Sequence, residues 1–333
     1  QATTMKYMFA KCGVLTELDV SKFNTRNVTD MSYMFDRCYA LETLDVSNFD
    51  TSKVTNMYAM FYGCRKVTAL DVSGFVTNSV KNMGCMFYEC FQVTELDVSD
   101  FDTTNVTNMQ YMFYSCTNLT TLDISDFNTT KVTDMHCMFS NCSNVTALNV
   151  SGFDTRKVTN MQYMFSGCSN VASLDVSGFV TTNVTDMSYM FNACKLVSTL
   201  DVRNFNTSNV TNMSNMFANA GYKSTLFTLN TSNFDTSSVT NMTRMFWNTG
   251  HDSTKFSTSI TIKNPLCLIA DSEFVFPEDF EIECYENSSA HEYAVKYGKE
   301  VDLIVVEVAS GKCGENMKWV FESDGCLSLE GKG

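Results

Sequence analysis

The chain has 333 residues, a net charge of −14 and a hydrophobic fraction of 44%. The negative charge argues against a nucleic-acid-binding protein, which needs a basic surface, and against docking on anionic lipid. The apolar fraction is that of a folded protein. No apolar run approaches the ~18 residues of a membrane span, so membrane insertion is not expected. Because the chain starts inside a repeat and shows no signal peptide, we expect it to be a piece of a longer protein.

A Met-Phe pair recurs along the chain at a fixed spacing. The pairs are Met8-Phe9, Met34-Phe35, Met60-Phe61, Met86-Phe87, Met112-Phe113, Met138-Phe139, Met164-Phe165, Met190-Phe191, Met216-Phe217 and Met245-Phe246. Successive pairs are 26 residues apart up to the ninth, and the tenth follows after 29. Such a period is typical of repeat proteins, in which each unit buries its apolar face only against its neighbours. We therefore expect stacked units that share one continuous core.

One unit, residues 30–56, predicts two kinds of element. Met31, Met34, Phe35 and Cys38 follow the i, i+3, i+4, i+7 spacing of a short helix, with Asp30 at the N-cap. The segment at 41–46 reads L-x-x-L-x-V and alternates like a half-buried strand. An Asp-Thr turn at 50–51 closes the unit. The fold class predicted is an α/β repeat solenoid, with a parallel β-sheet on one face and short helical turns on the other.

Eight cysteines share one slot of the repeat. They are Cys12, Cys38, Cys64, Cys90, Cys116, Cys142, Cys168 and Cys194. Stacked neighbours would have Cα atoms roughly 5 Å apart, within disulfide range, but their side chains would point the same way and each would have two equivalent neighbours. We therefore favour buried free thiols. The tail cysteines, Cys267, Cys284, Cys313 and Cys326, leave their pairing open, and no C-x-x-C or Cys/His cluster suggests a metal site.

The repeat pattern ends near residue 263, and the sequence then changes character twice. Residues 1–263 form the predicted solenoid of about ten repeats, with a last strand at 260–262. Residues 264–308 read as a C-terminal cap, with a helix opened by a Ser289/Glu292 capping box and ended by Gly298, followed by a strand at 301–308. Residues 309–333 read as the truncated start of a further β module, with a hairpin between 317–322 and 326–329.

The motif V-T-N-M-x-x-M-F-x-x-C-x-x-L-T-x-L-D-V-S-x-F-D-T, nearly complete in residues 106–129, resembles the 26-residue repeat of BspA-like bacterial surface proteins. The segments 262–303 and 310–333 resemble the closing segment and an accompanying β module of the same class. The resemblance implies a leucine-rich-repeat fold in a secreted or wall-attached protein that acts in adhesion or partner binding. It implies no cofactor and supplies no shared catalytic residues.

An acidic column lies on the outward side of the predicted strands. Its members are Asp19, Asp45, Asp71, Asp97, Asp123, Asp175 and Asp201, with Asn149 and Asn230 in the same slot. One interpretation is a strip for Ca²⁺ or for a basic partner. The other is a solvated ladder in which each carboxylate bonds to nearby Ser and Thr hydroxyls. We favour the second, because Ca²⁺ needs six to eight converging oxygens and a single column supplies few.

A tyrosine row is the second candidate site, because Tyr62, Tyr88 and Tyr114 follow the Met-Phe pair in three successive repeats. Stacked tyrosines could bind a sugar or a protein, although packing of the rings against one another is the commoner outcome.

Nothing in the sequence favours an enzyme, because it has no phosphate loop, nucleophile elbow or zinc motif. We expect a non-enzymatic surface adhesin or binding module for host or bacterial surface proteins or glycans. The alternative is a passive stalk that spaces another module from the cell surface.

Overall fold

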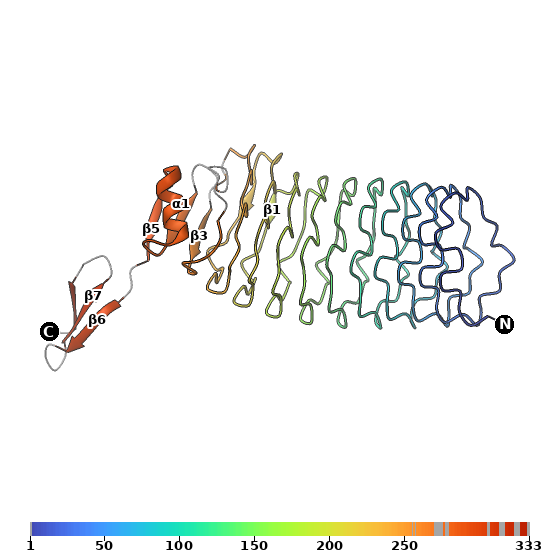
Figure 1. Cartoon of the computed structure of the whole chain (residues 1–333), viewed down its shortest axis with the longest axis horizontal. Coiled ribbons are helices and arrows are strands. Elements are labelled where there is room, and N and C mark those ends of the chain that lie inside the picture. The colour runs from blue at the N-terminus through green and yellow to red at the C-terminus, as the bar shows by residue number, and fades with distance from the viewer. Residues whose placement is uncertain are drawn as a thin grey trace.

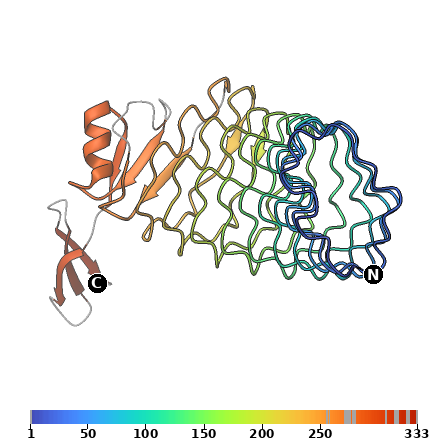
Figure 2. The ribbon, with the colours of Figure 1, turned by 45° about the vertical axis from the view of Figure 1, so that its right-hand side comes forward.

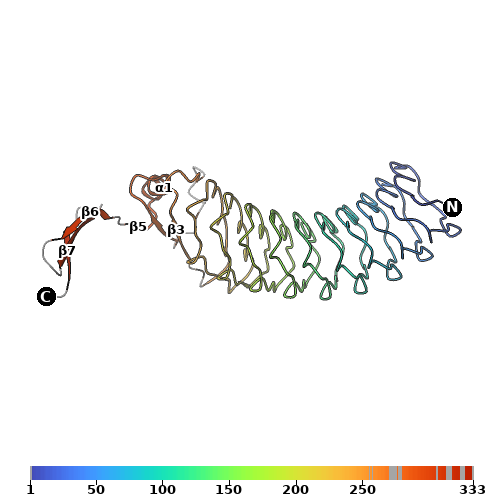
Figure 3. The same cartoon turned by 90° about the horizontal axis from the view of Figure 1, so that it is seen from below.

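Successive repeats form coils that stack along one axis (Figures 1 and 2). The computed structural model describes residues 2–254, 256, 258–269, 276, 280–304, 307–312, 317–322 and 327–331. Parallel bridges join equivalent residues of neighbouring coils, from Thr4↔Asp30 and Asp30↔Asn56 to Asn241↔Leu268. The stacking expected from the period is therefore confirmed. Seen from below, the stack curves gently along its length (Figure 3).

The Met-x-x-Met-Phe segment is a ribbon of turns, and the prediction of a short helix there is wrong. Met31 N–H donates to the Asn56 carbonyl of the next coil (3.0 Å), while Met34 N–H donates to the Met31 carbonyl within its own segment (3.2 Å). Tyr33 and Arg37 both have φ of 58°, in the left-handed region. A helix this short cannot offset the cost of its nucleation. Bonding to the adjacent coil satisfies the same backbone groups, so the ribbon forms instead.

Short polar side chains close turns at the start of the ribbon and at a later corner of the coil. The Asp30 carboxylate, expected at a helix N-cap, accepts the Ser32 N–H at 2.8 Å and so closes an Asx-type turn. The predicted turn at 50–51 is confirmed, because Asp50 accepts the Ser52 N–H at 3.0 Å. The residues expected at helix N-caps therefore do accept backbone N–H groups, but the element that they start is not a helix.

On the opposite face, which carries the L-x-x-L-x-V segments, the sequence predicts one long parallel sheet. Paired strands occur there only in the last coils. There β1 (Thr199–Leu200) pairs in parallel with β2 (Thr228–Leu229). In the earlier described coils this segment lies outside any assigned strand, with isolated bonds such as Glu42 N–H to the Thr16 carbonyl (3.1 Å). The expected direction is confirmed, but the regular inter-coil hydrogen bonding lies on the Met-Phe ribbon.

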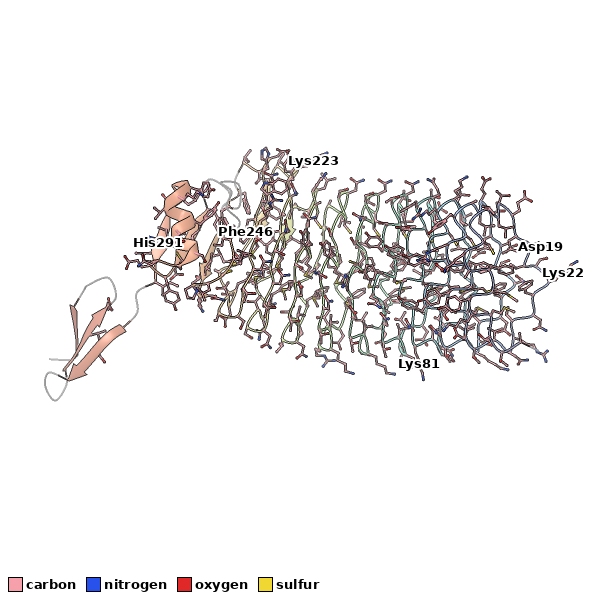
Figure 4. All side chains as sticks on the ribbon, in the orientation of Figure 1. Asp19, Lys22, Lys81, Lys223, Phe246 and His291 are labelled. Carbon is pink, nitrogen blue, oxygen red and sulfur yellow. The ribbon has the colours of Figure 1, made fainter. Side chains whose placement is uncertain are left out.

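A column of phenylalanine rings fills the centre of the stack. Phe35 lies 5.7 Å from Phe61 between ring centroids, with an interplanar angle of 3°. Phe113 continues the pattern, 5.6 Å from Phe87 and 5.8 Å from Phe139, and all of these rings are fully buried. Figure 4 places Phe246 inside the outline of the stack, with Lys81 and Lys223 at opposite edges. The core is continuous because each ring packs on the ring of the next coil.

The cysteine column consists of free thiols, as predicted. From Cys38 to Cys194 each thiol is buried and donates to a phenylalanine carbonyl of the preceding coil, as Cys142 does to Phe113 at 3.1 Å. Burial raises the pKa of Cys142 to about 12. In the tail, Cys267 and Cys284 are also free and buried, whereas Cys313 and Cys326 lie outside the described residues.

A second buried column, of threonines, was missed by the sequence reasoning. Its members are Thr25, Thr51, Thr77, Thr103, Thr129, Thr155, Thr181, Thr207 and Thr236. Each hydroxyl donates to a carbonyl of the next coil. Thr103 is typical: its Oγ1 donates to the Asn128 carbonyl (3.1 Å) and accepts the Asn128 N–H (2.7 Å). One hydroxyl thus satisfies a donor and an acceptor where the chain turns a corner.

The C-terminal part adds a parallel sheet and one helix. Strand β3 (Ser259–Ile262) pairs with β4 (Glu281–Cys284), and β4 pairs with β5 (Val301–Leu303). The predicted helix is present as α1 (Ser289–Tyr297), with Gly298 at its C-cap (φ 61°). Its N-cap is Ser288, whose side chain accepts the His291 N–H, rather than the predicted Ser289.

Aromatic side chains continue the core from the last coil into this part. Phe246 lies 4.6 Å from Phe280 and 5.8 Å from Phe276, and Phe276 packs edge-on against Tyr293 of α1. The prediction of a single strand at 301–308 is wrong, because β5 ends at Leu303. A separate antiparallel sheet follows, of β6 (Glu307–Lys312), β7 (Met317–Glu322) and β8 (Leu327–Gly331). The predicted hairpin is its β7–β8 pair.

Candidate functional site: an aromatic strip on the turn ribbon

The tyrosine row is brought together as one stack of rings. Tyr62 and Tyr88 lie 4.2 Å apart between centroids at an angle of 2°, and Tyr88 and Tyr114 lie 4.5 Å apart at 11°. All three side chains are half-buried. The rings therefore pack on one another, which is the commoner of the two outcomes weighed for them. Their inner faces are covered, so the row offers ring edges and hydroxyl groups to a ligand.

Aromatic residues from neighbouring slots extend this row, which the sequence reasoning did not foresee. Tyr111 lies 5.8 Å from Tyr88, and its hydroxyl is 3.0 Å from Nε2 of His136. His136 lies 6.5 Å from Tyr163, which stacks on Tyr189 at 4.3 Å. We call the continuous series the aromatic strip: Tyr62, Tyr88, Tyr111, Tyr114, His136, Tyr163 and Tyr189.

The turn ribbon positions the strip. Tyr111, Tyr163 and Tyr189 have φ between 56° and 60°, a conformation that costs a non-glycine residue about 1–2 kcal/mol. Hydrogen bonds across the stack hold it, since Tyr111 N–H donates to the His136 carbonyl at 2.8 Å. The signal in the sequence was that the two tyrosine slots lie three residues apart on one segment, and so meet across adjacent coils.

Burial favours the neutral form of several residues in the strip. It raises the pKa of Tyr88 and raises the pKa values of Tyr111 and Tyr163 to about 12. Burial also lowers the pKa of His136 from its ordinary value of 6.5. Because these tyrosines remain protonated, each hydroxyl can both donate and accept a hydrogen bond.

The acidic column lies exposed, with its carboxylates engaged by neighbouring serines. Asp45 Oδ1 accepts the Ser47 N–H (3.0 Å) and the Ser47 hydroxyl (2.6 Å), and the side-chain hydrogen bond is the main cause that lowers the pKa of Asp45. The same hydroxyl contact occurs at Asp71, Asp97, Asp123 and Asp175. Asp19 accepts a backbone N–H from Ser21.

Asp201, at the end of the acidic column, pairs instead with Arg203 at 2.7 Å, and that hydrogen bond lowers the pKa of Asp201 to about 2. In the part of the chain that the structure describes, no group of three or more His, Cys, Asp or Glu side chains could hold a metal ion. The serine contacts make the carboxylates a hydrogen-bonded ladder, the arrangement favoured from the sequence.

Comparisons with known proteins place these features in context. A family model described as "Mycoplasma protein of unknown function, DUF285" matches residues 3–121, 91–198 and 166–264. No curated protein matches the chain. A solved structure titled "Functional domain of InlJ from Listeria monocytogenes includes a cysteine ladder" aligns at 13% identity over 95% of this chain and 90% of that one. Its TM-score is 0.14, too low to support an argument about the fold.

None of the described helices has both the length and the apolar character needed to cross a membrane.

Proposed function

The chain belongs to the DUF285 family, and from this premise we propose that it is a non-enzymatic binding module of a cell-surface protein. The repeat resembles the leucine-rich-repeat class of BspA-like surface proteins, which suggests an extracellular, secreted or wall-attached location. Its partners would be proteins or glycans on a host or bacterial surface. The aromatic strip would be the contact surface.

The single observation that supports this proposal is the strip itself. Its half-buried rings form an unbroken series across six coils, from Tyr62 to Tyr189. Tyrosine is among the residues enriched in binding hot spots, because it offers a rigid apolar body together with a hydroxyl. A purely structural repeat would need only small residues in these slots, as at Ser140 and Ser166.

A passive stalk remains the second candidate, and one observation favours it. The phenylalanine column and the bridges on the ribbon continue from coil to coil without interruption, which suits a rigid spacer. The stacked tyrosine rings would also stabilise a stalk, so a binding assay has to separate the two candidates.

The two candidates differ in what the chain binds by itself. Residues 1–333 would be applied to arrays of glycans and of extracellular-matrix and bacterial surface proteins. The binding module predicts specific retention that Tyr88→Ala and Tyr163→Ala each weaken about tenfold, while Lys81→Ala, at the stack edge in Figure 4, changes nothing. Thermal unfolding of each variant would show that the stack is intact.

Either of two results would overturn the assignment. If the chain binds nothing while a longer protein containing it does bind, the stalk is correct. If Asp45→Asn abolishes binding and both tyrosine variants leave it unchanged, the acidic column carries recognition instead of the strip.

A further inference from the structure

One group of surface residues departs from the repeat. In coils 30–55, 56–81 and 82–107, the slot after the cysteine holds Tyr39, Arg65 and Phe91, whereas coils 134–159 and 160–185 have Ser143 and Ser169 there. Every coil supplies nearly the same backbone, so a site restricted to a few coils must come from slots that break the pattern. Large residues occupy this slot here, at exposed or half-buried positions.

These residues form a stack of rings and guanidinium groups. Arg65 lies between two rings, with its Cζ 4.4 Å from the Tyr39 centroid and 5.6 Å from the Phe91 centroid. Its Nη2 bonds Glu89 Oε2 at 2.6 Å. Arg37 lies over Tyr62, 5.7 Å from the ring centroid, which connects the group to the aromatic strip. We call this surface the Arg–Tyr patch: Arg37, Tyr39, Tyr62, Arg65, Tyr88 and Phe91.

A glycine makes room for the patch. Gly63, with φ of 70°, lies against the Tyr39 ring, and a Cβ at that position would come 3.1 Å from the ring. The missing side chain lets the Tyr39 ring lie close to Gly63 of the next coil, beside Arg65. The rings are thereby held in place before any partner arrives, which lowers the entropy cost of binding.

The two arginines differ in what they can still bind. Arg65 already forms a salt bridge with Glu89 and contacts the flanking rings of Tyr39 and Phe91. The Arg37 side chain is 44% exposed; its Nε forms an ion pair with Asp36 Oδ1 at 3.8 Å, longer than a hydrogen bond, and its guanidinium lies over Tyr62. A guanidinium in this state suits a carboxylate from outside, which it can engage through two parallel hydrogen bonds.

We propose that the Arg–Tyr patch binds an extended segment of a partner protein that carries an acidic side chain beside apolar ones; this rests on the proposed binding function. The acidic side chain pairs with Arg37, and the apolar side chains pack on Tyr39, Phe91 and the edges of the tyrosine row. Tyrosine and arginine together make up the composition of protein-binding hot spots. Flat stacking of a sugar on Tyr62 or Tyr88 is disfavoured, because Arg37 and the neighbouring tyrosine rings already lie on their faces.

A peptide array tests the proposal with residues 1–333. Peptides with apolar side chains interspersed with acidic, basic or neutral ones would be compared, and we expect the acidic set to be retained. Arg37→Ala should weaken that binding at least tenfold, and Arg37→Lys should recover only part of it, because lysine cannot form the bidentate pair. Binding should also weaken as salt rises.

The chain offers a matched control in Arg156, an exposed arginine outside the patch that pairs with Asp154. Arg156→Ala should leave peptide binding unchanged. Equal losses from the two arginine variants, or no preference for acidic peptides, would overturn the proposal. So would retention of uronic-acid oligosaccharides in place of peptides, since it would assign the patch to carbohydrate. Glycan or surface-protein binding that depends on Tyr163 but not on Arg37 would overturn this inference and leave the proposed function standing.

Discussion

The buried threonine column allows a quantitative test of how adjacent coils are joined. Thr103→Val keeps the side-chain shape but removes the hydroxyl that donates to the Asn128 carbonyl and accepts the Asn128 N–H. Thr103 is 1% exposed, so water cannot readily replace it. Each polar group left unpaired costs about 1–3 kcal/mol. Asn128 is only half-buried and the new methyl adds apolar burial, so we expect a net loss of about 2 kcal/mol.

Native-state hydrogen exchange is the suitable assay, because coils contact only their neighbours and the loss should be local. A loss of about 2 kcal/mol corresponds to roughly 30-fold faster exchange in coils 82–107 and 108–133. Thr107→Val is the matched control: Thr107 is exposed, and the Lys81 carbonyl that its hydroxyl contacts also accepts the Thr107 N–H. Thr103→Ser should retain most of the protection. If Thr103→Val changes exchange no more than Thr107→Val, the bridging hydroxyl does not join the coils.

Three further perturbations follow from the packing. Phe113→Ala removes a fully buried ring from the phenylalanine column and should cost about 3–5 kcal/mol in urea unfolding. Cys142 should resist alkylation until the stack unfolds. Burial raises the pKa of Cys142 from 9.0 to about 12. Its neutral thiol therefore contributes stability that is complete below pH 9 and is lost as pH rises toward 12. Cys142→Ala should reduce this loss of stability at alkaline pH. Gly221→Ala should destabilise, because φ is 61° and a Cβ would overlap the Phe227 ring.

Each of these has a result that would contradict it. A Phe113→Ala protein as stable as the parent would mean that the rings do not form one core. Rapid labelling of native Cys142 would contradict its burial. If Cys142→Ala leaves the loss of stability at alkaline pH unchanged, the Cys142 thiol does not cause that loss. For the glycine, Gly178→Ala is the control, since that position has no positive φ and its Cβ would meet only the Ser151 carbonyl, at 3.6 Å. Equal effects at the two glycines would refute the strain argument.

The stacking was predictable because it follows from the period alone. Residues 26 apart must occupy equivalent places in successive coils, so Phe35 and Phe61 meet whatever secondary structure lies between them. The same reasoning predicted the cysteine column and its free thiols. The threonine column was equally regular, but its residues were read together with the preceding Asp as a local turn. Periodicity shows that residues align, whereas their burial depends on the path of the chain within one coil.

The sequence could not exclude a helix, because the same spacing of apolar residues is compatible with a second structure, the turn ribbon. Apolar residues at i, i+3, i+4 and i+7 also face inward in a chain that turns repeatedly. In that arrangement every second N–H group donates to a carbonyl of the next coil. Tyr33 and Arg37 adopt positive φ in that arrangement, which their residue types disfavour locally. Bonds between coils, such as Tyr33 N–H to the Tyr58 carbonyl at 2.9 Å, offset the strain. Tertiary context thus overrides local propensity in this segment.

The candidate site was predictable only where it repeats. The tyrosine row stood out because one residue type fills one slot in three successive coils, but the aromatic strip mixes two slots and includes His136. The Arg–Tyr patch mixes slots further, and Arg65 meets Tyr39 and Phe91 only because consecutive coils place their equivalent residues side by side. In this chain the regular slots form the core, and both candidate surfaces lie where large side chains interrupt the repeat. The strongest signal for a site is therefore a group of large side chains that replaces small ones over a few adjacent coils.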